Sequence, residues 1–136
     1  MKKSILVLDA CAVIAAQCGE PGGDYCLNRL ADEGADAVIH AINVCEIYYD
    51  NLRRNPDADL NNLLDELDRW EVKIEYKIDI NLIHLASELK AYWRRISLAD
   101  CIAVALAKNL GGILLTTDHH ELDPLAEKGM PIEFIR

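Results

Sequence analysis

The feature that most constrains the fold is an alternation of short apolar runs with longer segments of helical periodicity. Residues 4–8 and 113–117 are apolar runs of the length expected for buried strands, and helical patterns separate them from further runs of the same kind. Strands that alternate with helices are joined by crossover connections. The pattern therefore predicts an α/β fold with a mainly parallel sheet that helices cover on both faces.

The expected element order is β-α-α-β-α-α-β-α-α-β-α-β. Strands are predicted at residues 4–8, 37–41, 72–76, 113–117 and 132–135. Helices are predicted at residues 10–17, 24–33, 43–54, 56–70, 79–95 and 97–110, with one more before the last strand. Three helix starts carry local signals: Asn55 before a proline, Asp79, and Ser97.

The size of the chain indicates a single domain over residues 1–136. No apolar run approaches the roughly 18–20 residues that a membrane helix needs. Five cysteines occur without a C-x-x-C pair, and most lie within apolar segments. This usage predicts reduced, mostly buried thiols in a cytoplasmic protein.

The charge balance is acidic, with 14 Lys and Arg residues against 23 Asp and Glu residues and a formal net charge of −9. A protein of this charge is not expected to bind nucleic acid through a broad basic surface. The balance leaves room for a local site at which carboxylates are required.

Four acids occupy the positions where parallel sheets bind ligands, beyond the carboxyl ends of the strands. Asp9 and Asp118 each follow a predicted strand directly. Glu46 and Asp100 each lie in the first turn of a predicted helix. Four acids from distant segments are therefore expected at one edge of one sheet.

Each acid also has a purely local explanation. Asn43-x-x-Glu46 and Ser97-x-x-Asp100 match or nearly match the capping box, in which the acid stabilises the start of its own helix. Asp9 and Asp118 are also suited to begin turns. Any one acid is explained in this way, but the convergence of all four favours a shared site.

Asp100 is the most informative of the four. Its helix is apolar almost all round over residues 98–107 and is expected to be buried, yet these ten residues include no Lys or Arg. The segment around Asp9, residues 4–16, lacks cations as well. Buried carboxylates need a partner, and neighbouring ones raise each other's pKa. Ligands that offer only oxygen suit Mg²⁺ or Mn²⁺.

Taken together, four short segments resemble a known family. They are Leu8-Asp9-Ala10, Asn43-Val44-Cys45-Glu46, Ser97-Leu98-Ala99-Asp100 and Thr116-Thr117-Asp118, in this order. Their order and spacing are similar to those of the PIN-domain ribonucleases, particularly the VapC-like toxins of prokaryotic toxin–antitoxin pairs. The resemblance extends over residues 6–135 and implies a PIN-like three-layer α/β/α fold with about five strands in a mainly parallel sheet.

The resemblance also implies an activity. In the family, the acids that match Asp9, Glu46, Asp100 and Asp118 hold one or two Mg²⁺ or Mn²⁺ ions and activate water to attack an RNA phosphodiester. It therefore implies a metal-dependent endoribonuclease, a small antitoxin partner and a homodimer. The alternative is a PIN-fold RNA-binding or assembly module with little or no nuclease activity, although the intact set of acids argues against it.

Residues around the cluster are candidates for accessory roles. Thr116 and Thr117 offer hydroxyls that would orient Asp118, whereas Glu121 and Asp123 either assist the site or, as we favour, only order the loop. Family members often carry Ser or Thr where this chain has Cys11, whose thiol is a poorer hydrogen-bond partner for a ligand or phosphate than a hydroxyl. His119 and His120 are expected to be exposed loop residues without a metal.

Basic residues near predicted helix ends are candidate RNA contacts. They are Arg53, Arg54, Lys90, Arg94 and Arg95. Cations are also favoured there by the helix dipole, so phosphate binding competes with a local explanation. Tyr92 and Trp93 lie among them and are suited to stack on bases, but core or dimer-surface roles are favoured.

Other carboxylate and phosphate enzymes fit the sequence less well. Haloacid-type phosphatases require Asp-x-Asp after the first strand, where this chain has Asp9-Ala10-Cys11. The strand ends lack the lysine of response-regulator receivers, and no glycine-rich nucleotide-binding motif is present.

Overall fold

The computed structural model describes residues 4–136, whose strands form one parallel sheet. The strands are β1 (Ser4–Leu8), β2 (Ala35–His40), β3 (Val72–Glu75), β4 (Ile113–Thr116) and β5 (Ile132–Phe134). They lie in the order β3-β2-β1-β4-β5, and every neighbouring pair is parallel. The predicted five-stranded parallel sheet is confirmed.

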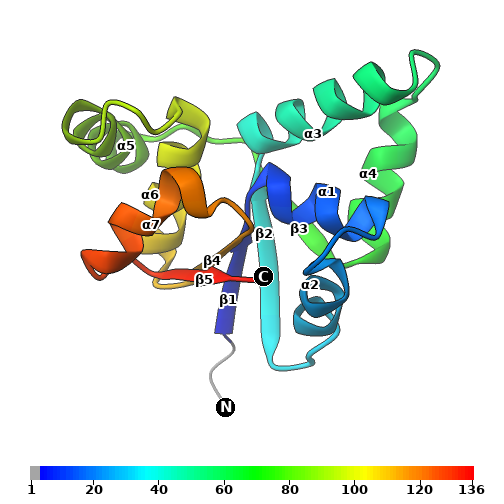
Figure 1. The fold of residues 1–136 in the computed structure, drawn as a ribbon, viewed down its shortest axis with the longest axis horizontal. Coiled ribbons are helices and arrows are strands. Elements are labelled where there is room, and N and C mark those ends of the chain that lie inside the picture. The colour runs from blue at the N-terminus through cyan, green and yellow to red at the C-terminus, as the bar shows by residue number, and fades with distance from the viewer. Residues whose placement is uncertain (1–3) are drawn as a thin grey trace.

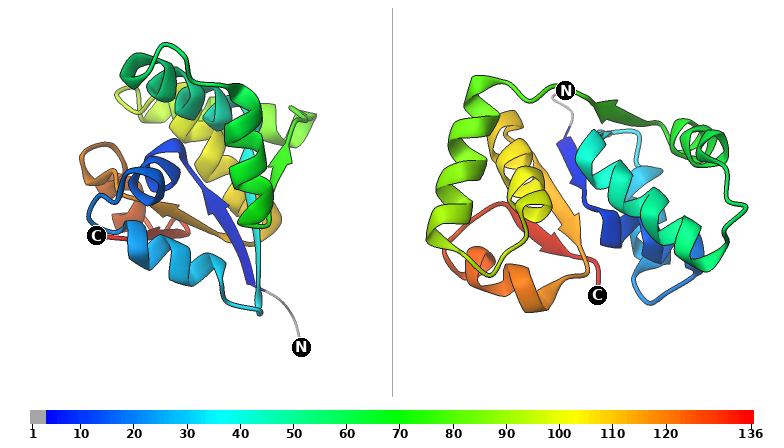
Figure 2. Two further views of the ribbon diagram at one scale, coloured as in Figure 1. Left: turned by 90° about the vertical axis from the view of Figure 1, so that its right-hand side faces the viewer. Right: turned by 90° about the horizontal axis from the view of Figure 1, so that it is seen from above.

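Helices cover both faces of this sheet. They are α1 (Ala10–Cys18), α2 (Gly23–Leu30), α3 (Ala41–Arg54), α4 (Leu60–Arg69), α5 (Ile80–Tyr92), α6 (Leu98–Leu110) and α7 (His119–Glu127). Figure 1 shows α1 to α4 on one side of the sheet and α5 to α7 on the other, and the views of Figure 2 agree. The three-layer α/β/α architecture is therefore confirmed. None of the described helices has the length and apolar character to cross a membrane.

The core has two halves because side chains on a strand point alternately to opposite faces. Leu6 and Leu8 of β1 pack into the half beneath α1 to α4, whereas Val7 packs into the half beneath α5 to α7. All three are fully buried. This double burial explains why β1 is an unbroken apolar run in the sequence.

Helix α6 is buried from Asp100 to Ala107, as its apolar sequence predicts. Its many small residues, among them Ala103, Ala105 and Ala107, are fully buried and let the helix lie close to the sheet. The helix packs on β1, β2 and β4. Its first turn, which contains Asp100, is therefore held at the carboxyl edge of the sheet, uppermost in Figure 1.

Helix α3 begins two residues earlier than predicted because His40 caps it. The His40 Nδ1 accepts a hydrogen bond from the Ile42 N–H at 3.1 Å, and its Nε2 donates to the Lys77 carbonyl at 2.9 Å. Asn43 is thus inside the first turn and Glu46 lies in the second. The capping-box explanation for Asn43 and Glu46 is wrong.

Other predicted boundaries are also wrong, since α2 ends at Leu30 and not at residue 33, and β2 spans Ala35–His40 and not residues 37–41. Asn55 does not start a helix: its Oδ1 accepts from the Asp57 N–H in a turn, and Asp59 caps α4 instead. Helix α5 ends at Tyr92 and not at residue 95. The Lys90 ammonium donates to the carbonyls of Arg94 and Ile96, which holds residues 93–96 as a turn after the helix.

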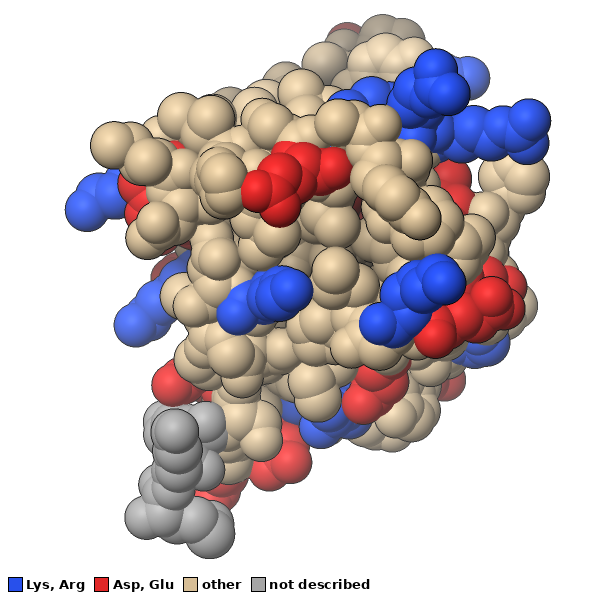
Figure 3. Space-filling model, turned by 90° about the vertical axis from the view of Figure 1, so that its left-hand side faces the viewer, with Lys and Arg blue, Asp and Glu red and all other residues tan. Residues whose placement is uncertain are grey.

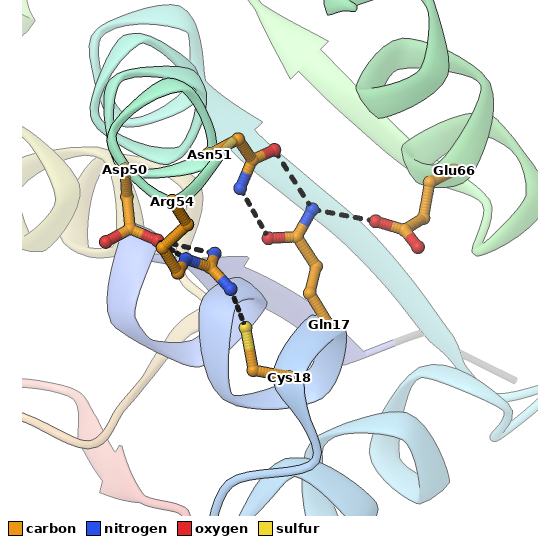
Figure 4. Close-up of polar contacts among 6 residues, drawn as sticks. All are labelled: Gln17, Cys18, Asp50, Asn51, Arg54 and Glu66. Atoms are coloured by element: carbon orange, nitrogen blue, oxygen red, sulfur yellow. Dashed lines mark hydrogen bonds and ion pairs between the residues drawn. The ribbon is translucent and has the colours of Figure 1, made fainter. Parts of the chain in front are cut away.

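Side-chain amides tie α1 to α3 and α4 (Figure 4). The amides of Gln17 and Asn51 donate to each other over 3.4 and 3.1 Å, and the Gln17 Nε2 also donates to Glu66 at 2.8 Å. Arg54 of α3 contacts both Asp50 and Cys18. These contacts hold the end of α1 opposite to Asp9.

Candidate metal centre

Asp9 follows β1 directly and is the N-cap of α1. Its Oδ1 accepts a hydrogen bond from the Ala12 N–H at 2.9 Å. The residue is fully buried, and its Oδ2 has no hydrogen-bond partner within residues 4–136. Asp9 therefore combines a local capping role with a second oxygen that is left free for a ligand.

Asp118 lies beside Asp9 because β4 pairs with β1, with Leu115 opposite Leu8. Its Oδ1 caps α7 by accepting from the Glu121 N–H at 3.0 Å. The Asp118 N–H in turn donates to the hydroxyl oxygen of buried Thr116 at 3.0 Å. This contact joins the Thr116 hydroxyl to the backbone of Asp118, and an orienting role for Thr116 stays a prediction.

Asp100 and Glu121 complete a compact acidic group with Asp118. Ser97 caps α6 by accepting from the Asp100 N–H at 3.1 Å, which confirms the predicted start of that helix. One carboxylate oxygen from each of Asp100, Asp118 and Glu121 lies within 4.8 Å of the others. Three carboxylates at this separation are able to share one cation.

Glu46 lies at the outer side of this group. It is exposed on α3, and its carboxylate is outside the compact group formed by the other three acids. Glu46 still raises the pKa of Asp9, and its own pKa is raised by partial burial and then by the charge of Glu121. The structure thus brings Asp100, Asp118 and Glu121 together at the carboxyl edge of the sheet, with Asp9 beside them and Glu46 farther out.

Burial dominates the electrostatics of the site. The pKa of Asp9 is raised to about 7, mainly by burial, with smaller contributions from the charges of Asp118 and Glu46, while the Thr116 hydroxyl and the Ala12 N–H oppose the shift. Burial also raises the pKa of Asp100, and so does its hydrogen bond with Glu121. Both shifts have the sign expected for carboxyls that lack a counter-charge.

The donor set fits a hard divalent cation. All the ligand atoms are carboxylate oxygens, the type that Mg²⁺ and Mn²⁺ prefer. No Lys or Arg side chain contributes to the pKa shifts of Asp9, Glu46 or Asp100. The unpartnered Asp9 Oδ2 points to the same conclusion, since a buried carboxylate oxygen needs a compensating partner.

Cys11 is a half-buried thiol close to these acids. Burial raises the pKa of its thiol to about 12, and the charges of Asp9, Asp100 and Asp118 add to the shift. The Thr117 hydroxyl contacts this thiol and partly opposes the shift. Thr117 therefore lies next to Cys11.

Glu121 and Asp123 differ in a way that the sequence analysis did not anticipate. Both lie on α7 and not in a loop, and only Glu121 joins the acidic group. Asp123 bonds the His119 Nδ1 at 2.8 Å, and the His119 ring stacks on Phe134. His119 and His120 are exposed, as expected, but they open this helix. The Asp118-x-x-Glu121 spacing was the signal that placed both acids on one helical face.

The basic candidates fall into two groups. Arg54 and Lys90 are engaged in the local contacts described above, and Arg53 lies over the Tyr49 ring at 5.5 Å. Arg94 and Arg95 are exposed and line a cavity of about 550 Å³ that Glu121 also lines. Figure 3 shows this side of the molecule, where Lys and Arg side chains stand among Asp and Glu without a continuous basic surface.

Comparison with known proteins gives one family match. The family model described as PIN domain matches residues 6–128. No curated protein matches the chain.

Solved structures with a similar fold are numerous. A toxin–antitoxin complex from Klebsiella pneumoniae shares 14% identity at a TM-score of 0.75, with 96% of this chain and 98% of that chain covered. VapBC-1 from nontypeable Haemophilus influenzae shares 16% identity at a TM-score of 0.68, with the same coverage of both chains. DNA-bound VapBC from Salmonella typhimurium shares 18% identity at a TM-score of 0.70, with both chains covered completely. At these identities the likeness concerns the fold.

Proposed function

The chain belongs to the PIN domain family, and we propose that it is a metal-dependent endoribonuclease that cleaves RNA phosphodiesters. One observation carries the proposal: Asp100, Asp118 and Glu121 gather beside Asp9 at a single sheet edge, and the buried pair Asp9 and Asp100 has raised pKa values to which no Lys or Arg of residues 4–136 contributes. Burying carboxylates without a counter-charge costs free energy, and such an arrangement is typical of a metal-dependent active site.

We assign the residues separate tasks. Asp100, Asp118 and Glu121 would hold Mg²⁺ or Mn²⁺, with Asp9 and Glu46 as further ligands that accommodate one or two ions. The bound cation would stabilise charge on the phosphate and lower the pKa of a water molecule. Thr116 keeps Asp118 in place through the Asp118 N–H.

RNA would be held locally, next to the acids. Arg94 and Arg95 are the exposed cations that line the cavity shared with Glu121, and Tyr92 beside them is an exposed ring suited to stack on a base. Arg53, Arg54 and Lys90 are weaker candidates because each has a contact within the fold.

We further propose that the chain is the toxin of a toxin–antitoxin pair. The support is the fold shared with the VapBC complexes, whose antitoxin would correspond to a small partner here. A homodimer is the proposed assembly, because Tyr76, Ile78, Ile80 and Ile83 expose apolar surface close together in the sequence. All five cysteines are free, as the reducing cytoplasm would require, but only Cys26 and Cys101 are buried, so the prediction that most are buried is wrong.

Cleavage of total RNA by the purified chain tests the proposal. Cutting is expected with Mg²⁺ or Mn²⁺, and EDTA or Asp100→Asn should abolish it. Asp65→Asn, which changes an exposed acid on α4, is the matched control and should leave cutting unchanged. Cutting that persists in both EDTA and Asp100→Asn would refute the proposal, whereas RNA binding without cutting would support a binding module instead.

A further inference from the structure

Asn43 is a buried polar residue that the fold does not satisfy. Its side chain is fully buried in the first turn of α3, and neither its Oδ1 nor its Nδ2 has a hydrogen-bond partner within residues 4–136. Buried side-chain amides almost always have partners. A third unsatisfied atom is the Oδ2 of Asp9.

The position of Asn43 relates it to the acids. It precedes Glu46 by three residues on α3, and residues at this spacing share one face of a helix. Helix α3 follows β2, which pairs with β1 so that Ile39 lies opposite Leu8, the residue before Asp9. Asn43 therefore lies at the carboxyl edge of the sheet, one turn closer to the strands than Glu46.

The unsatisfied atoms are chemically complementary to a loaded metal centre. An amide Nδ2 donates hydrogen bonds and the Asp9 Oδ2 accepts them. Mg²⁺ and similar cations keep several water ligands, which are strong donors for the Asn43 Oδ1. The three unsatisfied atoms, Asp9 Oδ2 and the Oδ1 and Nδ2 of Asn43, would gain hydrogen-bond partners when the cation and its waters are bound.

We propose that Asn43 is a positioning residue of the metal centre, whose amide is linked to the cation and to the Asp9 carboxylate through the water ligands of the cation. This inference rests on the proposed function, since it requires that the acids bind a divalent cation. It assigns Asn43 a role through other groups and not as a catalytic residue. Loss of such an outer contact typically weakens metal binding by about 10–100-fold.

The Asn43→Leu variant distinguishes a metal-positioning role of Asn43 from a purely structural one, because the two roles predict different changes in the Tm and in the Kd for Mn²⁺. The substitution keeps the branching and the number of side-chain heavy atoms, adds some volume and removes the unsatisfied polar atoms, so the metal-free variant should have an unchanged or higher Tm if the site accepts the larger side chain. Its Kd for Mn²⁺, measured by titration calorimetry, should rise by at least about 10-fold. A lower Tm with an unchanged Kd for Mn²⁺ would show a purely structural role and overturn the inference, and so would no change in either.

Asn51→Leu is the matched control on the same helix. Asn51 is hydrogen-bonded to Gln17 and lies far along α3 from the acids, so its replacement should lower the Tm and leave the Kd for Mn²⁺ unchanged. Asn43→Ala, which adds no bulk, replaces the Leu variant if that variant does not fold. Absence of Mn²⁺ binding by the wild-type chain would refute the proposed function itself. This outcome is distinct from failure of the Asn43 inference, in which the wild-type chain binds Mn²⁺ and the variant binds it equally well.

Discussion

Asp9 shows how one residue serves both the fold and the site. One of its carboxylate oxygens caps α1, and the other is buried without a partner. The cap stabilises the helix start, whereas burial of the carboxyl without a counter-charge costs free energy that a bound cation would offset. The same division holds for Asp118, which caps α7 and also belongs to the acidic group.

The raised pKa of Asp9 predicts a pH-dependent stability for the metal-free chain. Burial shifts this pKa from 3.8 in the unfolded chain to about 7 in the fold. The folded state thus binds the proton more tightly, so the contribution is complete below pH 3.8 and is lost as the pH rises to about 7. At about 1.4 kcal/mol per pH unit, the loss from pH 5 upward is on the order of 3 kcal/mol.

Thermal unfolding in EDTA between pH 5 and pH 8 measures this effect. The Tm should fall with rising pH by on the order of 10 °C. Asp9→Asn, which cannot ionise, should show a shallower dependence, and Mn²⁺ should restore the wild-type Tm at pH 8. A wild-type Tm that rises over this range would contradict the assigned electrostatics.

At the scale of elements, the strands and the buried helix α6 were predictable because buried segments are apolar in the local sequence. The unbroken apolar run of β1 and the apolar α6 follow directly from packing on both faces. The helix starts were harder. His40 is outside the usual set of N-cap residues, and its second hydrogen bond goes to Lys77, 37 residues away in the sequence.

Other features of the fold and the site could not be predicted because they depend on the folded surroundings of a residue and not on its sequence neighbours. Asn55 lies in a turn and not at a helix start, because an Asn side chain binds the backbone equally well in both settings. Glu121 was assigned to a loop, since only the folded α7 shows that its carboxylate faces Asp100. The unsatisfied amide of Asn43 is a property of its surroundings that no local pattern encodes.

The packing of α2 against α1 gives a prediction at this scale. Gly23 opens α2 in a buried position, where an added Cβ would lie 2.4 Å from the Ala15 carbonyl oxygen. Gly23→Ala should therefore force the two helices apart and lower the free energy of unfolding by about 1–3 kcal/mol. Gly34→Ala is the control, because its nearest atom would lie at an ordinary 3.5 Å. Urea unfolding compares the two, and equal midpoints would contradict the proposed contact.

For the whole molecule, the net charge of −9 has two separate consequences. Part of it is the acidic group, and a bound divalent cation would neutralise some of that charge. The remainder is spread over the surface, where acids and bases are interspersed on the side shown in Figure 3. An RNA would therefore be repelled at long range and held only by the few cations beside the site.

This charge distribution predicts a weak salt dependence of RNA binding. On an Asp100→Asn background that should not cut, log Kd plotted against log salt should have a slope that reflects only two or three phosphate contacts, at about 0.7 each for single-stranded RNA. Arg94→Ala with Arg95→Ala should flatten the slope by about 1.4, since both exposed cations line the cavity next to Glu121. Lys73→Ala, on the edge strand β3, should leave it unchanged. A steep wild-type slope, or one insensitive to the double substitution, would place the RNA on another face of the molecule.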